Sequence, residues 1–174
     1  AMDDLIITAA LGDAKTGEHG TTTTGFATAT QQIAAAASGL TIAKLRAAKK
    51  IFMRNEVDMD MDQLCIAVTA EQIEDLLATT EVTSSDYNTV KSLVQGNVDT
   101  FMGFKFIQIE RLGVDGSSAR RCIAWAKSGP HVGMWNDINT KVSERADKSY
   151  ATQVYVKGTF GATRTEEKKV VEII

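Results

Sequence analysis

The spacing of hydrophobic residues changes along this chain, and the change limits the folds that the chain can adopt. In the first half, large apolar residues recur every three to four positions, which is the period of an amphipathic helix. In the second half they alternate with polar residues or form short apolar runs, as in β-strands. Helices that precede strands, without regular strand–helix alternation, predict an α+β fold with a mixed or antiparallel sheet. The expected helices cover residues 2–11, 40–55, 69–77 and 86–93, and the expected strands cover residues 65–68, 104–109, 121–126, 153–156 and 170–174.

Residues at the ends of the expected helices support these boundaries. Gly12 is a favourable C-terminal cap for the first helix, and Thr41 is the expected N-cap of the helix over residues 40–55. Thr69 and Gln72 have the spacing of a capping box. The apolar face of the second helix consists of Ile42, Leu45, Ala48 and Phe52. Residues 13–39 are rich in Gly, Thr, Ala and Gln, which predicts a long flexible loop.

The composition is that of an ordinary globular protein. Of the 174 residues, 44% are hydrophobic and 24% are charged, which excludes a disordered tail or linker. The net charge of -3 argues against a nucleic-acid-binding protein. Cys65 and Cys122 each lie in an apolar run, which predicts buried, reduced thiols in a cytoplasmic product. The sequence has neither a membrane-spanning run nor a signal peptide pattern, so we expect a soluble protein that is not exported.

Three alternating aspartates form a candidate metal site. In an extended chain Asp58, Asp60 and Asp62 would share one face and could bind Ca²⁺ or Mg²⁺. An EF-hand would have glycine where Gln63 stands. The alternative is an edge strand or loop whose aspartates face water while the intervening methionines pack inward, and we favour this alternative.

A phosphate-binding loop is a second candidate site. Residues 12–17 (GDAKTG) contain two suitably spaced glycines, but Glu18 and His19 follow where a P-loop requires Lys and then Ser or Thr. We therefore favour a flexible Gly/Thr loop over nucleotide binding.

A catalytic triad is a third candidate. Ser128, His131 and Asp137 lie close together in the sequence, but triads are recognised by geometry and not by local crowding. The chain lacks a GxSxG elbow, and Gly129 with Pro130 predicts a turn leading into a strand. A surface or packing histidine is favoured.

Two aromatic residues and one basic helix complete the candidates. Trp125 and Trp135 could line a ligand groove, although aromatics in adjacent strands more often pack in a core or an interface. The basic residues of the second helix are expected to form a solvated face that could also pair with an acidic neighbouring subunit. They are Lys44, Arg46, Lys49, Lys50 and Arg54.

Several segments, taken in order, resemble the major capsid proteins of tailed bacteriophages, whose shell fold is also found in herpesvirus capsids. The strongest is residues 150–164 (YATQVYVKGTFGATR) followed by residues 170–173 (VVEI), which is similar to the strand pair that ends many family members. Earlier segments in the family's order are residues 4–12, 39–48, 75–77 and 102–104. The resemblance covers essentially the whole chain.

The resemblance implies a fold with a peripheral lobe and an axial lobe. On this map residues 1–12 would be the end of the peripheral lobe's spine helix, residues 13–39 the flexible loop, residues 40–147 the axial lobe and residues 148–174 strands of the peripheral lobe. Complete family members also have an N-terminal arm, an extended loop and most of the spine helix, for which this chain has no room. Together with the alanine before Met2, this indicates a piece of a longer protein.

The implied function is that of a structural subunit in the icosahedral capsid of a tailed phage or prophage, acting through contacts in pentamers and hexamers. No catalytic, cofactor-binding or metal-binding residues are then expected. The implied partners are other copies of the subunit, with scaffolding and portal proteins as further candidates and without sequence-specific nucleic acid or a membrane. The implied location is the virion capsid, assembled in the bacterial host cytoplasm, and the isolated fragment is expected to be a monomer or a weak oligomer.

Two alternatives remain open from the sequence. The shell protein of an encapsulin-like nanocompartment has a similar fold. A divalent-metal-binding module or hydrolase would instead use Asp58, Asp60 and Asp62.

Overall fold

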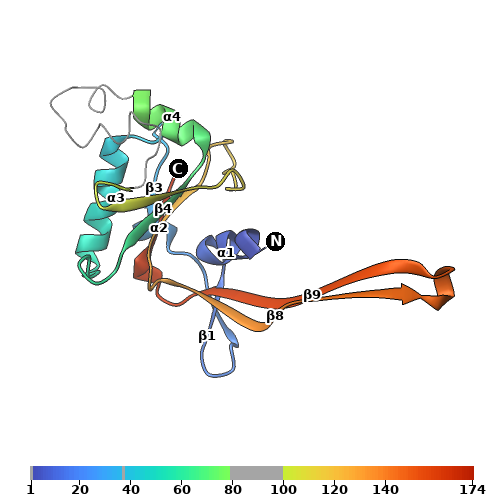
Figure 1. Ribbon diagram of the computed structural model, residues 1–174. Helices are drawn as coiled ribbons and strands as arrows, with labels where there is room; N and C mark the ends of the chain where they lie inside the picture. Colours follow the sequence, from blue (N-terminus) through green and yellow to red (C-terminus); the bar gives the residue numbers. More distant parts are fainter. Residues whose placement is uncertain (1, 37, 79–99) are drawn as a thin grey trace.

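The computed structural model describes residues 2–36, 38–78 and 100–174 (Figure 1). The expected helix over residues 86–93 lies outside them. In the described part of the chain, no helix is long and apolar enough to cross a bilayer. The helices are α1 (Met2–Leu11), α2 (Thr28–Gln31), α3 (Ile42–Arg54) and α4 (Ala70–Ala78), with 3-10 turns η1 (Ala146–Lys148) and η2 (Glu167–Lys169). The strands are β1 (Ala14–Thr16), β2 (Thr22–Thr24), β3 (Gln32–Ile33), β4 (Leu64–Val68), β5 (Thr100–Phe101), β6 (Phe104–Gln108), β7 (Cys122–Ala126), β8 (Pro130–Arg145), β9 (Ala151–Arg164) and β10 (Val170–Ile173).

A mixed six-stranded sheet organises the core. Its strand order is β3-β10-β7-β4-β6-β5, with β4/β6 and β3/β10 parallel and the other pairs antiparallel. All five residues of the central strand β4 are buried, because the sheet is covered on both faces. This arrangement confirms the predicted α+β class. We call the sheet with α1, α3 and α4 the body.

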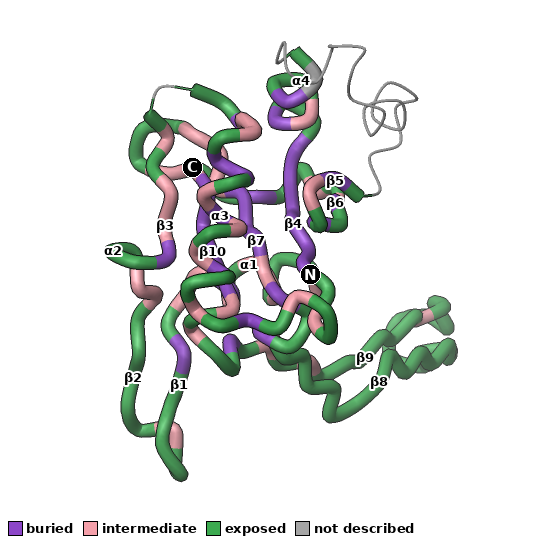
Figure 2. Tube along the Cα trace, turned by 90° about the vertical axis from the view of Figure 1, so that its left-hand side faces the viewer, coloured by how far each residue is buried: buried purple, intermediate pink, exposed green. Residues whose placement is uncertain are grey.

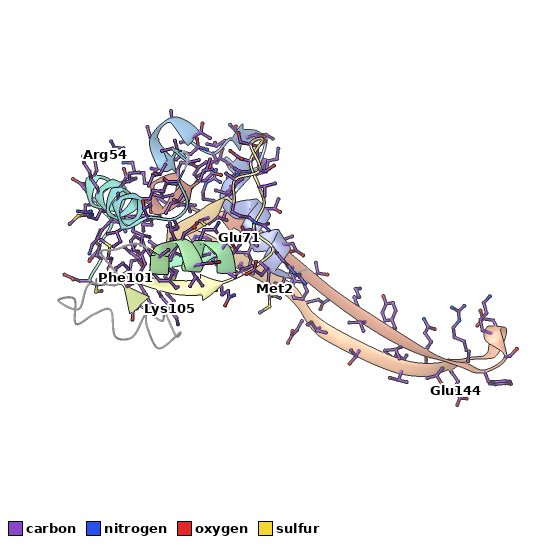
Figure 3. All side chains as sticks on the ribbon, turned by 90° about the horizontal axis from the view of Figure 1, so that it is seen from above. Met2, Arg54, Glu71, Phe101, Lys105 and Glu144 are labelled. Atoms are coloured by element: carbon purple, nitrogen blue, oxygen red, sulfur yellow. The ribbon has the colours of Figure 1, made fainter. Side chains whose placement is uncertain are left out.

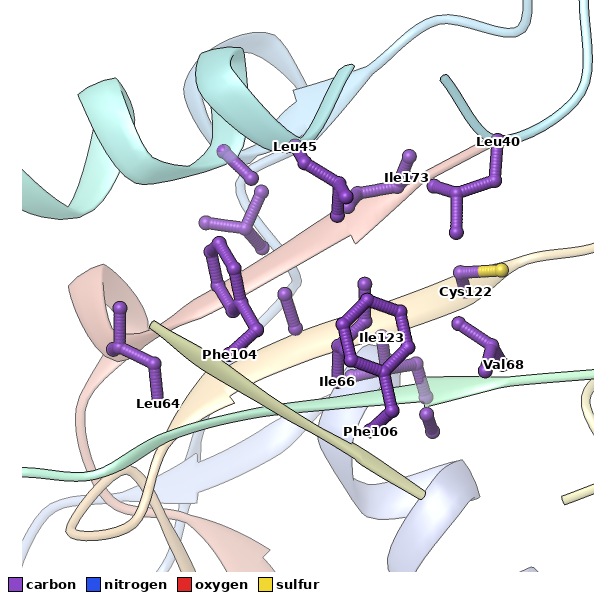
Figure 4. Close-up of a cluster of buried hydrophobic side chains, with 14 of the residues drawn as sticks. Leu40, Leu45, Leu64, Ile66, Val68, Phe104, Phe106, Cys122, Ile123 and Ile173 are labelled. Carbon is purple, nitrogen blue, oxygen red and sulfur yellow. The ribbon is translucent and has the colours of Figure 1, made fainter. Parts of the chain in front are cut away.

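Helix α3 covers one face of the sheet. Alternate residues of β4, beginning with Leu64 and Ile66, lie in the buried cluster with Leu45 of the helix (Figure 4). The Phe52 ring packs against Phe104 with centroids 6.2 Å apart and an interplanar angle of 52°. Truncating a buried side chain of this size to alanine costs about 3–5 kcal/mol. The predicted apolar face is confirmed: Leu45, Ala48 and Phe52 are fully buried.

The predicted caps hold these helices in place. The Thr41 hydroxyl accepts a hydrogen bond from the Lys44 backbone N–H at 3.4 Å. The Thr69 backbone N–H donates to Gln72 Oε1 at 3.2 Å, and the Glu110 carboxylate accepts the Ala70 N–H at 2.7 Å. Each bond satisfies an N–H group near a helix start that the helix itself cannot pair.

The basic face predicted for α3 needs a correction at Lys44, which is buried. Its ammonium donates to the backbone oxygens of Ser38 and Ile174, at 2.5 and 2.8 Å. Burial lowers the pKa of Lys44, while Cys122 and Asp75 oppose that shift. Lys44 therefore holds the end of β10 and is not part of a solvated face.

A second buried charge lies on the other face of the sheet. The carboxylate of Glu172 in β10 is fully buried; it pairs with Arg121 and accepts a hydrogen bond from Gln32 Nε2 at 2.7 Å. These partners supply the hydrogen bonds that a buried carboxylate requires. They also join β10 to β3 and to the residue before β7.

Residues 13–39, predicted as a flexible loop, contain short regular elements that composition did not predict. β1 and β2 form an antiparallel hairpin, in which Lys15 pairs with Thr23, and α2 leads into β3. The β-branched threonines favour strands, and Gly17 and Gly20 supply the positive φ angles of 86° and 63° in the turn. The short strand β3 then joins the main sheet beside β10.

The strand pairing also crosses the boundary predicted at residues 147 and 148. β9 pairs along its length with β8, and β10 lies inside the six-stranded sheet between β3 and β7. The last two strands, β9 and β10, therefore lie in different sheets.

Candidate assembly surface

The β8–β9 hairpin projects from the body as a long two-stranded arm (Figure 1). Its strands pair from Pro130 with Arg164 at the base to Arg145 with Ala151 at the tip. Figure 2 shows that nearly all of its residues are exposed, whereas β4, β7 and β10 are largely buried. An isolated two-stranded hairpin is at best marginally stable in water. Beyond its base, the arm therefore has little packing besides the pairing of its two strands.

The two faces of the arm differ in chemistry. Cross-strand partners point to the same side of a hairpin, so Val142 and Val154 share one face while Lys141 and Tyr155 share the other. By the same alternation along β9, the first face continues to the base of the arm. We call it the apolar face, and it consists of Val132, Met134, Val142, Val154, Val156, Phe160 and Ala162. We call the opposite face of the distal half the lysine face, and it contains Asn139, Lys141, Ser143, Gln153, Tyr155 and Lys157.

The exposure of the apolar face is what distinguishes this arm from an ordinary surface hairpin. Val142 is 67% exposed, Val154 is 66% and Val156 is 58%. Contiguous exposed apolar residues of this kind mark interaction surfaces. Figure 3 shows the arm's side chains standing free on both sides of the ribbon, with Glu144 near the tip.

The arm's register shifts twice near its middle, between Met134 and Asn136 and between Asn136 and Asn139. Such irregularities leave residues of one strand unpaired and redirect side chains. Trp135 lies at the first shift and is 89% exposed. The two tryptophans considered as the lining of a groove lie apart in their surroundings. Trp125 is partly buried against the core beside α1, and Trp135 faces outward from the arm.

Arg164 anchors the arm to α1. Its guanidinium is fully buried and donates from Nη1 to the backbone oxygens of Ala10 and Gly12, each at 2.8 Å. Its Nε donates to Glu167 Oε2 at 2.7 Å, and its plane lies over the Phe26 ring, 5.3 Å from the centroid. Because cations stabilise the carbonyl end of a helix, Arg164 joins the C-terminus of α1 to the base of the arm.

A second, more exposed set of polar contacts, centred on Lys169, connects the base of the arm to the body. The Lys169 ammonium contacts Ser128 Oγ at 2.8 Å, Glu166 Oε2 at 2.9 Å and Asp62 Oδ2 at 3.6 Å, and the Ser128 hydroxyl donates to Asp62. The hydrogen bond with Glu166 raises the pKa of Lys169, and Asp62 adds to the shift. A Cβ on Gly129 would lie 2.9 Å from Lys169 Cβ and 3.0 Å from its backbone oxygen, so the connection requires glycine. The arm is held at its base from both sides.

The three candidate aspartates do not share one face of an extended strand. They lie in a turn, where Asp58 Oδ1 accepts the backbone N–H groups of Asp60 and Met61 at 3.0 and 3.2 Å. Asp62 instead joins the Lys169 group at the junction. Within residues 2–36, 38–78 and 100–174, no group of three or more His, Cys, Asp or Glu residues could hold a metal ion. The geometry that motivated the metal hypothesis is therefore wrong.

The candidate triad is not assembled. Ser128 hydrogen-bonds with Asp62 and Lys169, whereas His131 is exposed on β8 opposite Thr163. The Asp137 carboxylate accepts the backbone N–H of Ile138 at 2.7 Å. The predicted turn leading into a strand at Pro130 is confirmed.

Cys65 and Cys122 are buried and free, as predicted. Burial raises the pKa of Cys65, and it raises that of Cys122 to about 12. A thiol with a raised pKa is a poor nucleophile at neutral pH. Residues 12–17 end α1 and form β1, so the glycine pair follows a helix and not the strand that a P-loop requires.

Known capsid structures share this fold. A chain of the cyanophage Pam1 capsid matches with a TM-score of 0.69 and 13% identity, covering 98% of this chain and 63% of that one. A chain from Mycobacterium phage Che8 matches with a TM-score of 0.64 and 15% identity, over 98% of this chain and 55% of that one. The holo-SrpI encapsulin complex from Synechococcus elongatus is less similar, with a TM-score of 0.51 and 9% identity over 82% of this chain and 52% of its own. This chain thus spans less than two thirds of those proteins and has the tailed-phage capsid fold.

Comparison at the sequence level gives the family. No curated protein matched the sequence. A family described as "Phage capsid protein" matches residues 1–174, which is the whole chain. The chain therefore belongs to the phage capsid protein family.

Proposed function

We propose that this chain is part of a structural subunit of a tailed-phage or prophage icosahedral capsid. It acts by packing against other copies of itself in pentamers and hexamers. Its location is the virion capsid, which assembles in the host cytoplasm, and scaffolding and portal proteins are further partners during assembly. It has no catalytic role.

The exposed arm is the observation that carries this proposal. A shell subunit must place large apolar surfaces where neighbours can cover them, and the arm's apolar face is of this kind. The arm is also joined to the body by a buried guanidinium and by the Lys169 group, so it extends in a defined direction. A defined direction is needed for a lattice with regular contacts.

The division into lobes follows from the same features. We assign the β8–β9 arm and α1 to the peripheral lobe, because Arg164 joins them. The six-stranded sheet with α3 and α4 is assigned to the axial lobe, including β10. This proposal replaces the sequence-based boundary at residue 147 with the two ends of the arm, Pro130 and Arg164, and it groups α1 with the arm and not with the rest of the body.

The encapsulin alternative is weaker. The encapsulin chain has a lower TM-score than the Pam1 and Che8 chains, and the matching family is a phage capsid family. The metal-dependent alternative loses its support because Asp58, Asp60 and Asp62 lie in a turn, and the described part of the chain has no group of three or more His, Cys, Asp or Glu residues that could hold a metal ion.

Self-assembly of the purified chain tests the proposal. Sedimentation velocity and negative-stain electron microscopy are recorded as protein concentration rises. We expect weak association of the wild-type chain that increases with concentration. In a matched variant, residues 134–160 are replaced by Asn-Gly, a pair that favours the tight turn between Gly133 and Gly161. This variant should keep the circular dichroism of the body and remain monomeric. A wild-type chain that sediments like the matched variant at every concentration would overturn the proposal.

A further inference from the structure

We propose that the lysine face of one copy's arm docks against the acidic loop of a second copy, head to tail. The acidic loop is residues 53–62, which begin with the last two residues of α3 and end before β4. The inference rests on the proposed capsid function and names the two surfaces that would meet.

The lysine face is an unpartnered surface with positive charge. Lys141 and Lys157 lie on the same side of the arm, next to Tyr155, and neither forms an ion pair with another described residue. Around them is a shallow polar hollow lined by Asn136, Asp137, Asn139, Lys141, Tyr155 and Lys157. The hollow thus contains two lysines and one aspartate, whereas Arg145, which is nearer the tip, is already paired with Asp147. The face therefore fits a partner with negative charge and hydrogen-bonding groups.

The acidic loop has the complementary character. It contains four acidic residues and Arg54 as its one basic residue, and Glu56, Asp58 and Asp60 are exposed. Exposed methionines flank these carboxylates: Met61 is 86% exposed and Met53 is 62%. Flexible, exposed methionines next to charges provide apolar contact for a docking partner. The loop thus offers both charge and apolar area to the arm of another copy.

The two surfaces lie at opposite ends of the molecule. Figure 3 labels Arg54, at the start of the acidic loop, and Glu144, near the tip of the arm, at the two ends of the view. One copy's arm therefore reaches away from its own loop. Contact between two different patches of identical subunits is heterologous, and such contacts propagate into closed rings or open lattices. A shell requires contacts of this type.

A charge-swap experiment on the whole chain tests the docking. One variant reverses the arm (K141E/K157E), and a second reverses the loop (D58K/D60K). Sedimentation velocity measures self-association of each variant and of an equimolar mixture. In each variant alone, the arm and the loop that would meet carry charge of the same sign. Each variant should therefore associate at least about tenfold more weakly than wild type. The mixture restores opposite charges at every contact between unlike copies, so association should return. A K105E/K127E variant changes two exposed lysines of the body and should associate like wild type.

The outcomes separate the docking from the capsid function. If wild type assembles and either reversed variant assembles equally well, or if the mixture does not recover, the docking is wrong while the capsid function stands. If wild type forms no assembly, both fail. Retention on double-stranded DNA is measured in parallel. Loss of DNA binding in K141E/K157E, with D58K/D60K assembling normally, would assign the lysine face to nucleic acid and overturn the inference.

Discussion

Replacing Arg164 by methionine would test the anchoring of the arm most sharply. The variant keeps a long, buried apolar stem but removes the guanidinium that contacts Ala10, Gly12 and Glu167. Breaking a buried charge pair by removing one partner costs about 3–5 kcal/mol. Two features reduce the loss: Glu167 is 27% exposed and can be hydrated, and Arg164 Nη2 is already buried without a partner. We therefore expect a loss of about 3 kcal/mol.

Thermal unfolding followed by circular dichroism would measure this loss. For a domain of this size, about 1 kcal/mol lowers the melting temperature by roughly 2–4 °C, so Arg164→Met should melt about 6–12 °C below wild type. The matched control is Arg111→Met, because Arg111 and Asp4 form a pair whose side chains are 60% and 53% exposed. Exposed pairs contribute below about 1 kcal/mol. If Arg164→Met melted within about 2 °C of wild type, as the control should, Arg164 would not anchor the arm.

Three further predictions concern the arm and its junction. Val142→Lys and Val154→Lys should each change the free energy of unfolding by less than about 0.5 kcal/mol, because both sites are exposed. Each should nevertheless abolish self-association in sedimentation velocity. Unchanged self-association would exclude the apolar face as an interface. Gly129→Ala should cost about 1–3 kcal/mol in denaturant unfolding because its Cβ meets Lys169, and an unchanged midpoint would contradict that geometry. Lys169 has a raised pKa, so its stabilisation is complete below the ordinary value of 10.5 and is lost as pH rises through the raised value. Lys169→Gln should therefore destabilise at neutral pH, and the difference should shrink above pH 10.5; a difference independent of pH would argue against the ion pairs.

The helices and central strands could be predicted because their determinants are local. Ile42, Leu45, Ala48 and Phe52 repeat at helical spacing, and Thr41 stands where an N-cap belongs. β7 and β10 are short apolar runs that have few alternatives to a buried strand. In each case the pattern that predicts the element is contained within it.

The arm was missed in part because its sequence pattern is irregular. Residues 130–145 form one long strand, but the register shifts around Asn136 interrupt the alternation from which strands are recognised. Its apolar residues also face outward, so burial could not reinforce the pattern. The apolar run around Val154, Tyr155 and Val156 predicted only the first part of β9. An exposed strand whose partner surface lies outside the chain gives a weak local signal.

The anchors could not be predicted because their partners are distant in sequence. Arg164 contacts backbone oxygens that lie 154 and 152 positions earlier, and Lys44 contacts one that lies 130 positions later. Every residue has a backbone carbonyl, so the sequence does not show which carbonyls accept these hydrogen bonds. By composition alone, both residues resemble ordinary surface charges.

We propose above all that the arm of this capsid-family chain is an interface between subunits. A cryo-electron microscopy map of assemblies formed by the chain would test it most directly. We expect subunits arranged in rings of five or six, with Val142 and Val154 covered by protein density. Ordered assemblies in which both valines remain in solvent would contradict it.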